Sequence, residues 1–433
     1  MPRIYTYIFL FLASIAIAGC IYRDIRLERQ HPGDLRNRVV GARLQKDGIS
    51  PYFYGWDSTQ PFRYYDPSAY DFIAASNITA SPFFHQLLYP IADIPQRSFS
   101  KIWLLLQYLC WASMLAIAAS LATSQRQRLL IAAVAILFLF MRFWTDTVFQ
   151  GQHYFVMGWF CFVFIALLYR PAGQWPVLIA GMAGAALILL RPTMIFFLLP
   201  FLFLWREWPL KKLLPGMAGA LLVLILALSS GQSRYYWQQY RSAVNEHVKL
   251  HQHLQPDPGH KVHFTRHRIY EGWDLNQADS AARRYRYKGS GESSNVFVWY
   301  KLFFHQRMPV SWMMAGNLLL IATLLLYYYR RVVLRNGFTV AQAGLLGICL
   351  YMIADYFSPI HRFAYNGMPW LTALLMLGWY RRLPYSIYGL FLLALLLLIL
   401  PWHIIPMQYS IGEYLLLTGT LITSTKKNTT AFV

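Results

Sequence analysis

Residues 176–205 read PVLIAGMAGAALILLRPTMIFFLLPFLFLW, and Arg191 is the only charged residue among them. Arg191 and Pro192 divide this stretch into two apolar blocks, 176–190 and 193–205. Proline at the start of a helix loses no hydrogen bond, because the first helical amides have no partner within the helix. We therefore expect a tight connection between two helices at Arg191-Pro192, with a single broken helix as the alternative.

Comparable apolar blocks recur along the whole chain. A bilayer core about 30 Å thick is crossed by about 20 apolar helical residues, and the chain supplies such blocks again and again. We predict an all-α integral membrane protein, a single polytopic helical bundle with eleven or twelve transmembrane helices. The predicted spans lie near residues 4–22, 101–122, 128–143, 153–169, 176–190, 193–205, 213–230, 309–328, 338–355, 366–379, 385–403 and 408–424.

The composition excludes an ordinary soluble globular protein. Of the 433 residues, 57% are hydrophobic and only 13% are charged, whereas about a quarter are charged in an average soluble domain. The mean hydropathy is +0.35, and a 17% aromatic content suits a chain with many helix ends at membrane interfaces. All four cysteines fall within apolar blocks, so neither a disulfide framework nor a cysteine-rich metal site is expected.

The distribution of basic residues indicates the orientation of the spans, because short cytoplasmic connections are enriched in Lys and Arg. If the N-terminus is cytoplasmic, the basic residues of the short outer connections are only Arg142, Arg191 and Arg362. Glu207 is the only acidic residue in the inner connections. The basic residues of the inner connections are Arg126, Arg128, Arg170, Arg206, Lys211, Lys212, Arg330, Arg331, Arg335, Arg381, Arg382, Lys426 and Lys427.

This bias predicts two long external loops, 23–100 and 231–308, and a cytoplasmic tail at 425–433. The expected location is the plasma or inner membrane of a bacterium, with the functional face toward the periplasm or the exterior. The net charge of +21 would suggest nucleic acid as a partner of a soluble protein. Here the basic residues lie where membrane orientation requires them, so we expect membrane lipids and no nucleic acid as partners.

Carboxylates gather on the predicted outer side. The two long loops contain eight and six of the 18 acidic residues, and Asp146 and Asp355 lie at predicted outer helix ends. Acid–base chemistry is therefore expected on the outer face. The short inner connections contain no glycine-rich phosphate loop and no dinucleotide fingerprint.

Two further patterns each allow two interpretations. Ile17-Ala18-Gly19-Cys20 resembles the cleavage box of a bacterial lipoprotein signal, but only one basic residue, Arg3, precedes the apolar block, so we expect a plain membrane anchor. The second long loop contains a histidine run that suggests a metal site, although its neighbours are mostly Lys, Arg and aromatic residues. We expect no metal and interpret the run as part of a basic, aromatic external loop. The run comprises His247, His251, His253, His260, His263 and His267.

Short motifs at the predicted outer helix ends occur in a characteristic order along the chain. They are Gly33-Asp34-Leu35-Arg36 after the first span, Pro51-Tyr52, Pro82-Phe83-Phe84, Tyr89-Pro90-Ile91, Gly151-Gln152-His153-Tyr154, Arg191-Pro192 and Ser358-Pro359 with His361-Arg362. This series resembles the family 87 glycosyltransferases. These are membrane enzymes of the GT-C fold that use polyprenyl-phosphate sugars and include mannosyltransferases.

The resemblance extends from the first span to the tenth, with three departures. Tyr154 stands where the family usually has Asn, and Arg191 replaces the usual Lys. The loop 231–308 has no counterpart that we can place. The first two changes preserve hydrogen bonding and positive charge, so the expected reaction class is affected less than the identity of the sugar and acceptor.

The resemblance implies roles for individual residues. Asp34 is the expected general base, and Asp146 is a second choice. Arg191, Arg362 and Arg36 are the expected ligands of the donor phosphate, since guanidinium groups match phosphate oxygens. Taken from the residues alone, the alternative for each arginine is an interfacial side chain, which explains Arg36 equally well but Arg191, at the buried ends of two short helices, less well. His361 is a secondary catalytic candidate, and Gln152 is expected to line the same cavity.

These roles describe a glycosyltransferase of the outer membrane face that needs no cofactor. A polyprenyl-phosphate sugar is the expected donor, and a lipid-linked or cell-envelope glycan is the expected acceptor. The sugar, mannose or another hexose or pentose, would be transferred by an inverting single displacement. The alternative is a transporter or flippase of a lipid-linked envelope precursor, which would favour an internal repeat and charged or broken helices at mid-membrane.

Overall fold

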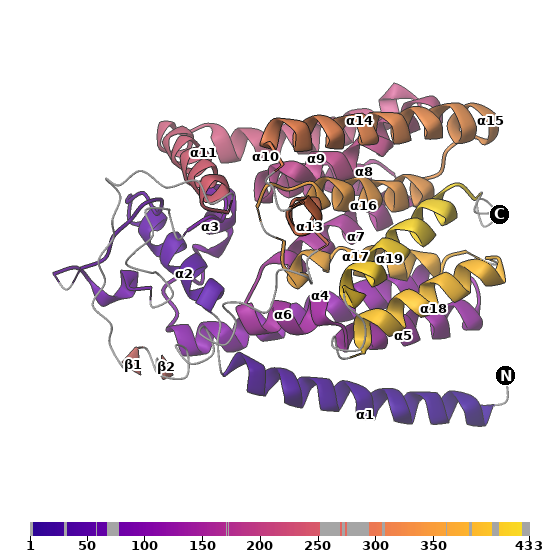
Figure 1. The fold of residues 1–433 in the computed structure, drawn as a ribbon, viewed down its shortest axis with the longest axis horizontal. Helices are drawn as coiled ribbons and strands as arrows, with labels where there is room; N and C mark the ends of the chain where they lie inside the picture. Colours follow the sequence, from indigo (N-terminus) through magenta and orange to yellow (C-terminus); the bar gives the residue numbers. More distant parts are fainter. Residues whose placement is uncertain are drawn as a thin grey trace.

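The computed structural model describes residues 3–29, 33–57, 59–66, 78–169, 171, 173–251, 269–270, 273–274, 294–304, 308–360, 362–380, 383–400 and 407–426. The described chain is helical apart from two strands of two residues each. Both termini lie at one end of an elongated helical bundle, and α2, α3, α11, β1 and β2 lie beyond its other end (Figure 1). We call this second end the outer end.

The outer end is partly helical, although the sequence pattern predicted only long loops there. Its helices are rich in polar residues and carry no long apolar block, so hydropathy alone did not reveal them. β1 and β2 pair antiparallel, with Ile269 opposite Asp274. The elements of this end are α2 (Gly33–Lys46), η1 (Phe62–Tyr64), α3 (Pro82–Leu88), α11 (Gly231–His251), β1 (Ile269–Tyr270) and β2 (Trp273–Asp274).

The remaining elements form the bundle and its edge. They are α1 (Arg3–Glu28), α4 (Gln96–Leu121), α5 (Gln125–Leu139), α6 (Arg142–Gln150), α7 (Tyr154–Tyr169), α8 (Gln174–Leu190), η2 (Pro192–Met194), α9 (Ile195–Leu198), η3 (Leu199–Arg206), α10 (Leu210–Leu228), α13 (Val296–Phe304), α14 (Val310–Tyr328), η4 (Tyr329–Val333), α15 (Leu334–Asn336), α16 (Val340–Tyr356), η5 (Ala364–Gly367), α17 (Trp370–Leu377), α18 (Tyr385–Ile399) and α19 (Gln408–Ser424). Each predicted span coincides with one or more of these helical segments.

Four helices of the described chain are long and apolar enough to cross a membrane: α1 from Ile4 onward, α4, α10, and α14 with its continuation to Val333. The pair α5 and α6, bent by 51°, makes a fifth if it counts as one span. Shorter apolar helices include α7, α8, α16 and α18. The architecture is therefore compatible with a helical membrane protein.

The connection at Arg191-Pro192 is confirmed. α8 ends at Leu190, Arg191 is extended, and a new helical segment starts at Pro192. The helix found at the predicted span 366–379 is shorter than predicted, because α17 has only eight residues, all of them buried. Eight residues rise only about 12 Å, which is too short to cross a bilayer unaided.

Close packing of small residues holds part of the bundle together. α8 and α10 approach each other so closely that a Cβ atom at Gly181 would lie 1.8 Å from the carbonyl oxygen of Gly216. Glycine allows such backbone contact, which is common between helices in membranes. α16 is buried along its entire length and contacts α7, α9, α17 and α19. It is therefore the central helix of the bundle.

α1 lies along the edge of the bundle and is attached through its last turns (Figure 1). Asp24 is fully buried there, and its carboxylate accepts hydrogen bonds from Tyr108 and from the indole of Trp144, both at 2.6 Å. Arg23 pairs with the same carboxylate at 2.8 Å. Cys20 is buried within this continuous helix.

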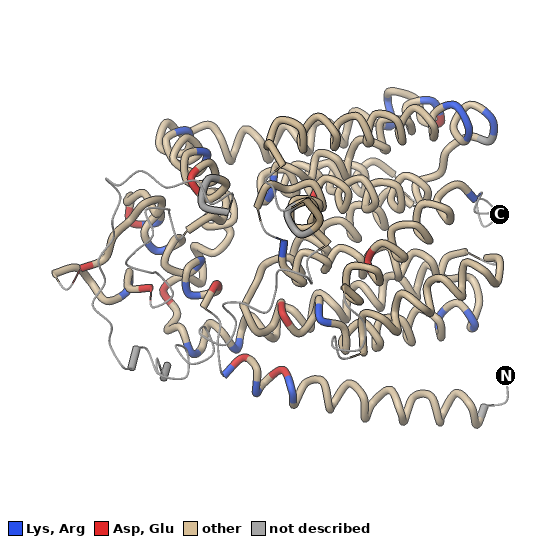
Figure 2. Tube along the Cα trace, viewed as in Figure 1, with Lys and Arg blue, Asp and Glu red and all other residues tan. Residues whose placement is uncertain are grey.

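Charged residues are distributed unevenly between the two ends of the bundle (Figure 2). The end that holds both termini carries exposed Lys and Arg in the connections around α5, α10 and α15, with Glu207 as their acidic neighbour. The outer end carries acidic and basic residues together (Figure 2). Arg170, Arg381, Arg382 and Lys427, which the orientation prediction also used, lie outside the described residues.

Candidate functional site

Asp34 lies in the first turn of α2, where a carboxylate is stabilised by the positive end of the helix dipole. Two arginines of the same helix tie the surrounding irregular chain to it. Arg36 donates to the carbonyl of Tyr65 at 2.7 Å, and Arg43 donates to the carbonyls of Ala92 and Ile94 at 2.7 and 3.0 Å. These hydrogen bonds hold α2 in place together with its own buried apolar side chains, Leu35, Val39, Val40 and Leu44.

The carboxylate of Asp34 is held by a residue distant in the sequence. Gln152 donates from its amide nitrogen to Oδ2 of Asp34. Arg38, one turn after Asp34, donates to the amide oxygen of Gln152 at 2.6 Å and to the backbone carbonyl of Asp34 at 2.5 Å. Gln152 is therefore fixed in one orientation, with its nitrogen toward the carboxylate and its oxygen toward the guanidinium.

A turn at Gly151 brings Gln152 into this position. Gly151 ends α6 with a φ of 65°, a left-handed conformation that glycine adopts at little cost. His153 follows Gln152, and its Nδ1 accepts a hydrogen bond from Nε of Arg38 at 3.2 Å. The neutral imidazole of His153 therefore carries its proton on Nε2. The ring of Phe84 in α3 packs on His153, with centroids 4.5 Å apart. α3 is itself capped by Ser81, which accepts from the amide of Phe84 at 3.2 Å.

The environment of Asp34 makes its carboxylate a stronger base than a free one. Burial raises the pKa of Asp34 above its ordinary value, and the nearby Arg38 guanidinium and the Gln152 hydrogen bond counteract this only in part. A carboxyl group with a raised pKa is suited to accept a proton near neutral pH.

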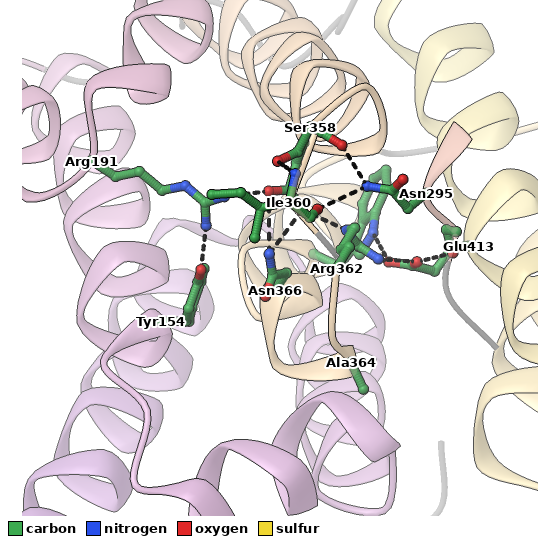
Figure 3. A network of polar contacts seen from close by, with 12 residues as sticks. Tyr154, Arg191, Asn295, Ser358, Ile360, Arg362, Ala364, Asn366 and Glu413 are labelled. Atoms are coloured by element: carbon green, nitrogen blue, oxygen red, sulfur yellow. Dashed lines mark hydrogen bonds and ion pairs between the residues drawn. The ribbon is translucent and has the colours of Figure 1, made fainter. Parts of the chain in front are cut away.

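Arg191 lies between α8 and η2, with its side chain 21% exposed. It donates to the hydroxyl of Tyr154 (Figure 3) and to Oδ1 of Asp355, the latter at 2.6 Å. The rings of Tyr154 and Tyr351 lie 5.2 and 5.8 Å from its central carbon. Tyr154 thus contacts the guanidinium through both its ring and its hydroxyl, and Arg191 is a preorganised cation on a partly exposed side chain.

Arg362 is buried in a network of carboxylates (Figure 3). Its Nε donates to Oδ2 of Asp355 at 2.5 Å, and its two terminal nitrogens donate to the two oxygens of Glu413. The guanidinium is only 1% exposed, and both carboxylates are fully buried. Asn366 donates to both oxygens of Asp355 at 3.2 and 3.3 Å. Arg362 is therefore saturated by protein groups.

The two groups of residues are neighbours. His153 and Tyr154 are adjacent in the sequence, and one belongs to the Asp34 cluster while the other binds Arg191. The hydroxyl of Tyr365 is close enough to interact electrostatically with Asp34, Arg38 and Tyr154. We call the set Asp34, Arg38, Gln152, Tyr154 and Arg191 the outer site.

The predicted site residues separate into three classes. Asp34, Gln152 and Arg191 are brought together. Arg36 donates to the backbone carbonyl of Tyr65, and Arg362 binds the carboxylates of Asp355 and Glu413. This arrangement supports neither arginine as a phosphate ligand. Asp146 forms an ion pair with Arg142 one turn earlier on α6, with Nε and Oδ2 3.3 Å apart. His361 lies outside the described residues.

Most of the predicted histidine run, from His253 onward, also lies outside the described residues. His247 is on α11, where burial lowers its pKa to about 4. Within the described parts of the chain, no group of three or more His, Cys, Asp or Glu residues could hold a metal ion.

Sequence reasoning missed Arg38, Asp355 and Glu413 as members of these networks. Arg38 had a usable signal, because it follows Asp34 by four residues and shares a helix face with it. The pairing of Arg362 with Glu413 joins the irregular chain before η5 to α19, and no local spacing indicates it. Comparison with protein-family models, curated proteins and solved structures found no match for this chain.

Proposed function

We propose that this protein is a polytopic GT-C-type membrane glycosyltransferase, similar to family 87, with eleven or twelve spans. It transfers a sugar from a polyprenyl-phosphate donor to a lipid-linked or envelope glycan acceptor at the outer membrane face. The observation that carries the proposal is the convergence of a carboxylate of raised pKa, Asp34, with an accessible fixed cation, Arg191, through adjacent residues of one turn.

Asp34 is the general base of the proposed reaction. It takes the proton of the acceptor hydroxyl as the acceptor oxygen attacks the anomeric carbon of the donor. The bond from that carbon to the phosphate oxygen breaks, and polyprenyl phosphate leaves with the bonding electrons. A single displacement of this kind inverts the anomeric centre. Gln152 and Arg38 hold the carboxylate in a fixed position, which lowers the entropic cost of reaching the reactive geometry.

Arg191 is the proposed ligand of the leaving phosphate. Its bidentate guanidinium fork matches phosphate oxygens, and it is already oriented by Tyr154 and Asp355. A fixed cation of this kind stabilises the negative charge that develops on the phosphate oxygen.

A partly exposed aromatic ring lies beside the outer site. Tyr240 of α11 packs its ring on the buried ring of Tyr52, with centroids 5.8 Å apart. Tyr240 also lies close enough to Arg191 and Tyr154 to interact with them electrostatically. Aromatic rings present flat apolar faces with polar edges, which suit the binding of a sugar ring beside the outer site.

The test is to offer purified protein in native lipid extract a panel of polyprenyl-phosphate sugars and to follow each carrier by mass spectrometry. We expect one donor to lose its sugar and yield free polyprenyl phosphate. A control with the same sugars on nucleoside diphosphates should show no consumption. No consumption of any polyprenyl-phosphate sugar, with movement of a lipid-linked precursor across the vesicle membrane instead, would favour a flippase.

A further inference from the structure

We propose that Asp355 is an internal counter-ion that competes with substrate phosphate for Arg191 and so limits the affinity of the outer site for polyprenyl phosphate. The proposal rests on the assignment of phosphate binding to Arg191. Asp355 itself is fully buried and cannot contact a substrate. It acts on the substrate only through the guanidinium of Arg191, which makes it a positioning residue.

The first support is the sharing of Asp355 between two arginines. Its Oδ1 accepts from Arg191 at 2.6 Å and its Oδ2 accepts from Arg362 at 2.5 Å. The two oxygens thus have different partners, the partly exposed Arg191 and the buried Arg362. A carboxylate placed in this way neutralises Arg191 from its protein side.

The second support is that Glu413 satisfies Arg362 separately. Both oxygens of Glu413 accept from Arg362, and Trp370 and Ser294 donate to the same carboxylate. Because Glu413 already balances the charge of Arg362, the charge of Asp355 remains available to balance Arg191. The four residues together carry two positive and two negative charges, so phosphate reaches a cation whose charge is already compensated.

The third support is that the orientation of Arg191 does not depend on Asp355 alone. The Tyr154 hydroxyl accepts from Nη1, and the rings of Tyr154 and Tyr351 lie on the guanidinium. Removing the carboxylate therefore removes a competing negative charge while most of the orientation persists. We expect electrostatic competition to outweigh the loss of one hydrogen bond, so that phosphate binds more tightly without Asp355.

The functional consequence is faster release of the product. Polyprenyl phosphate leaves the reaction with more negative charge than the phosphodiester donor had, and a bare Arg191 would hold it tightly. The fixed carboxylate of Asp355 next to the guanidinium weakens the binding of polyprenyl phosphate to Arg191 after sugar transfer. Asp355 thereby favours turnover over product retention.

The experiment measures the dissociation constant of farnesyl phosphate, a short-chain probe, for detergent-purified full-length protein. Asp355→Asn should tighten binding about tenfold. The matched control is Glu413→Gln, which removes an equally buried carboxylate of the same network that does not contact Arg191, and which should change affinity less than threefold. In an Arg191→Gln background, Asp355→Asn should change affinity less than twofold, because the two residues act through one contact.

A second variant changes no charge and tests the proposal in the opposite direction. Asn366→Ala removes the hydrogen bonds that Asn366 donates to Asp355, leaves that carboxylate a stronger competitor, and should weaken farnesyl phosphate binding about threefold. This variant keeps the proposal testable if Asp355→Asn does not fold, as judged by its thermal melting. Unchanged or weaker binding by folded Asp355→Asn, or equal effects in the Arg191→Gln background, would overturn the proposal.

Binding and transfer fail separately in this design. A parent protein that binds farnesyl phosphate, and whose Asp355→Asn variant binds it more tightly, supports the counter-ion proposal even if no sugar donor is consumed. A parent protein that consumes a donor while Asp355→Asn leaves farnesyl phosphate affinity unchanged supports the transferase and rejects the counter-ion. With an identified donor, Asp355→Asn should lower both KM and kcat, because product release becomes slow.

Discussion

At the scale of single residues, the role of a charged side chain in this protein is determined by how many protein acceptors it already has. Arg36, Arg38 and Arg43 lie on one helix of 14 residues, yet only Arg38 contacts the Asp34 cluster. Asp34 was predicted from the family resemblance, and Arg191 also because it stands alone between two apolar blocks. Arg36 was predicted in place of Arg38, because the helix on which Arg38 follows Asp34 by one turn was not predicted.

The pH dependence of transfer should report the environment of Asp34. The base acts only when deprotonated, so kcat/KM is expected to fall as the pH falls through the pKa of Asp34. Burial raises that pKa, so the acidic limb should lie above the value of about 3.9 of an unperturbed aspartate. Initial rates across a pH series measure this limb, and a flat profile down to pH 4 would contradict the assignment.

Arg38 and Arg36 offer a matched pair of substitutions. Arg38→Gln removes the hydrogen bond that orients Gln152 toward the Asp34 carboxylate, and is expected to lower the kcat of the folded protein about 10- to 100-fold. Arg36→Gln leaves buried carbonyls unpaired, and is expected to lower the melting temperature while the folded fraction keeps its kcat. Rate and thermal melting measured on both variants distinguish the two roles, and interchanged results would refute them.

At the scale of helices, hydropathy predicted the apolar elements well and the polar ones poorly. The break at Arg191-Pro192 was predictable because proline chemistry is local. α2 and α11 were predicted as loop, because neither contains the long apolar block by which the spans were predicted. The short α17 was overestimated because burial by α16 and other helices makes an eight-residue helix as apolar as a full span.

The contact between α8 and α10 predicts a position-specific effect of adding one methyl group. Gly181→Ala places a Cβ atom 1.8 Å from the Gly216 carbonyl oxygen, so the helices must separate and the free energy of unfolding should fall by at least about 1–3 kcal/mol. Gly389→Ala in α18 is the control, because its Cβ atom would meet nothing within 4 Å. Thermal melting in detergent compares the two, and equal melting temperatures would contradict the close approach.

At the scale of the whole molecule, both termini lie at one end of the bundle and the outer site lies toward the other (Figure 1). Basic residues dominate the end with the termini (Figure 2). The described basic connections from which the orientation was predicted therefore lie at one end of the bundle. The site itself was less predictable, because Gln152 reaches Asp34 and Glu413 reaches Arg362 only after the bundle has formed.

Cysteine labelling tests this orientation. In a background lacking the four native cysteines, Thr59→Cys and Gln238→Cys, both exposed at the outer end, should react with a membrane-impermeant thiol reagent in intact cells. Gln125→Cys, exposed at the start of α5, should react only after permeabilisation. The expected pattern places the outer site outside the cell. Labelling of Gln125→Cys in intact cells, without labelling of the other two, would reverse the orientation.

The central claim is that Asp34 promotes sugar transfer at the outer face. It is tested most directly by supplying a short-chain polyprenyl-phosphate sugar to sealed right-side-out membrane vesicles, which contain the natural acceptors, and measuring the release of polyprenyl phosphate. Vesicles with the parent protein, or with Asp93→Asn at an exposed ion pair of the same external segment, should release it. Asp34→Asn should lower the rate about 10²- to 10⁴-fold. Equal rates for Asp34→Asn and Asp93→Asn, or release only in inside-out vesicles, would contradict the account.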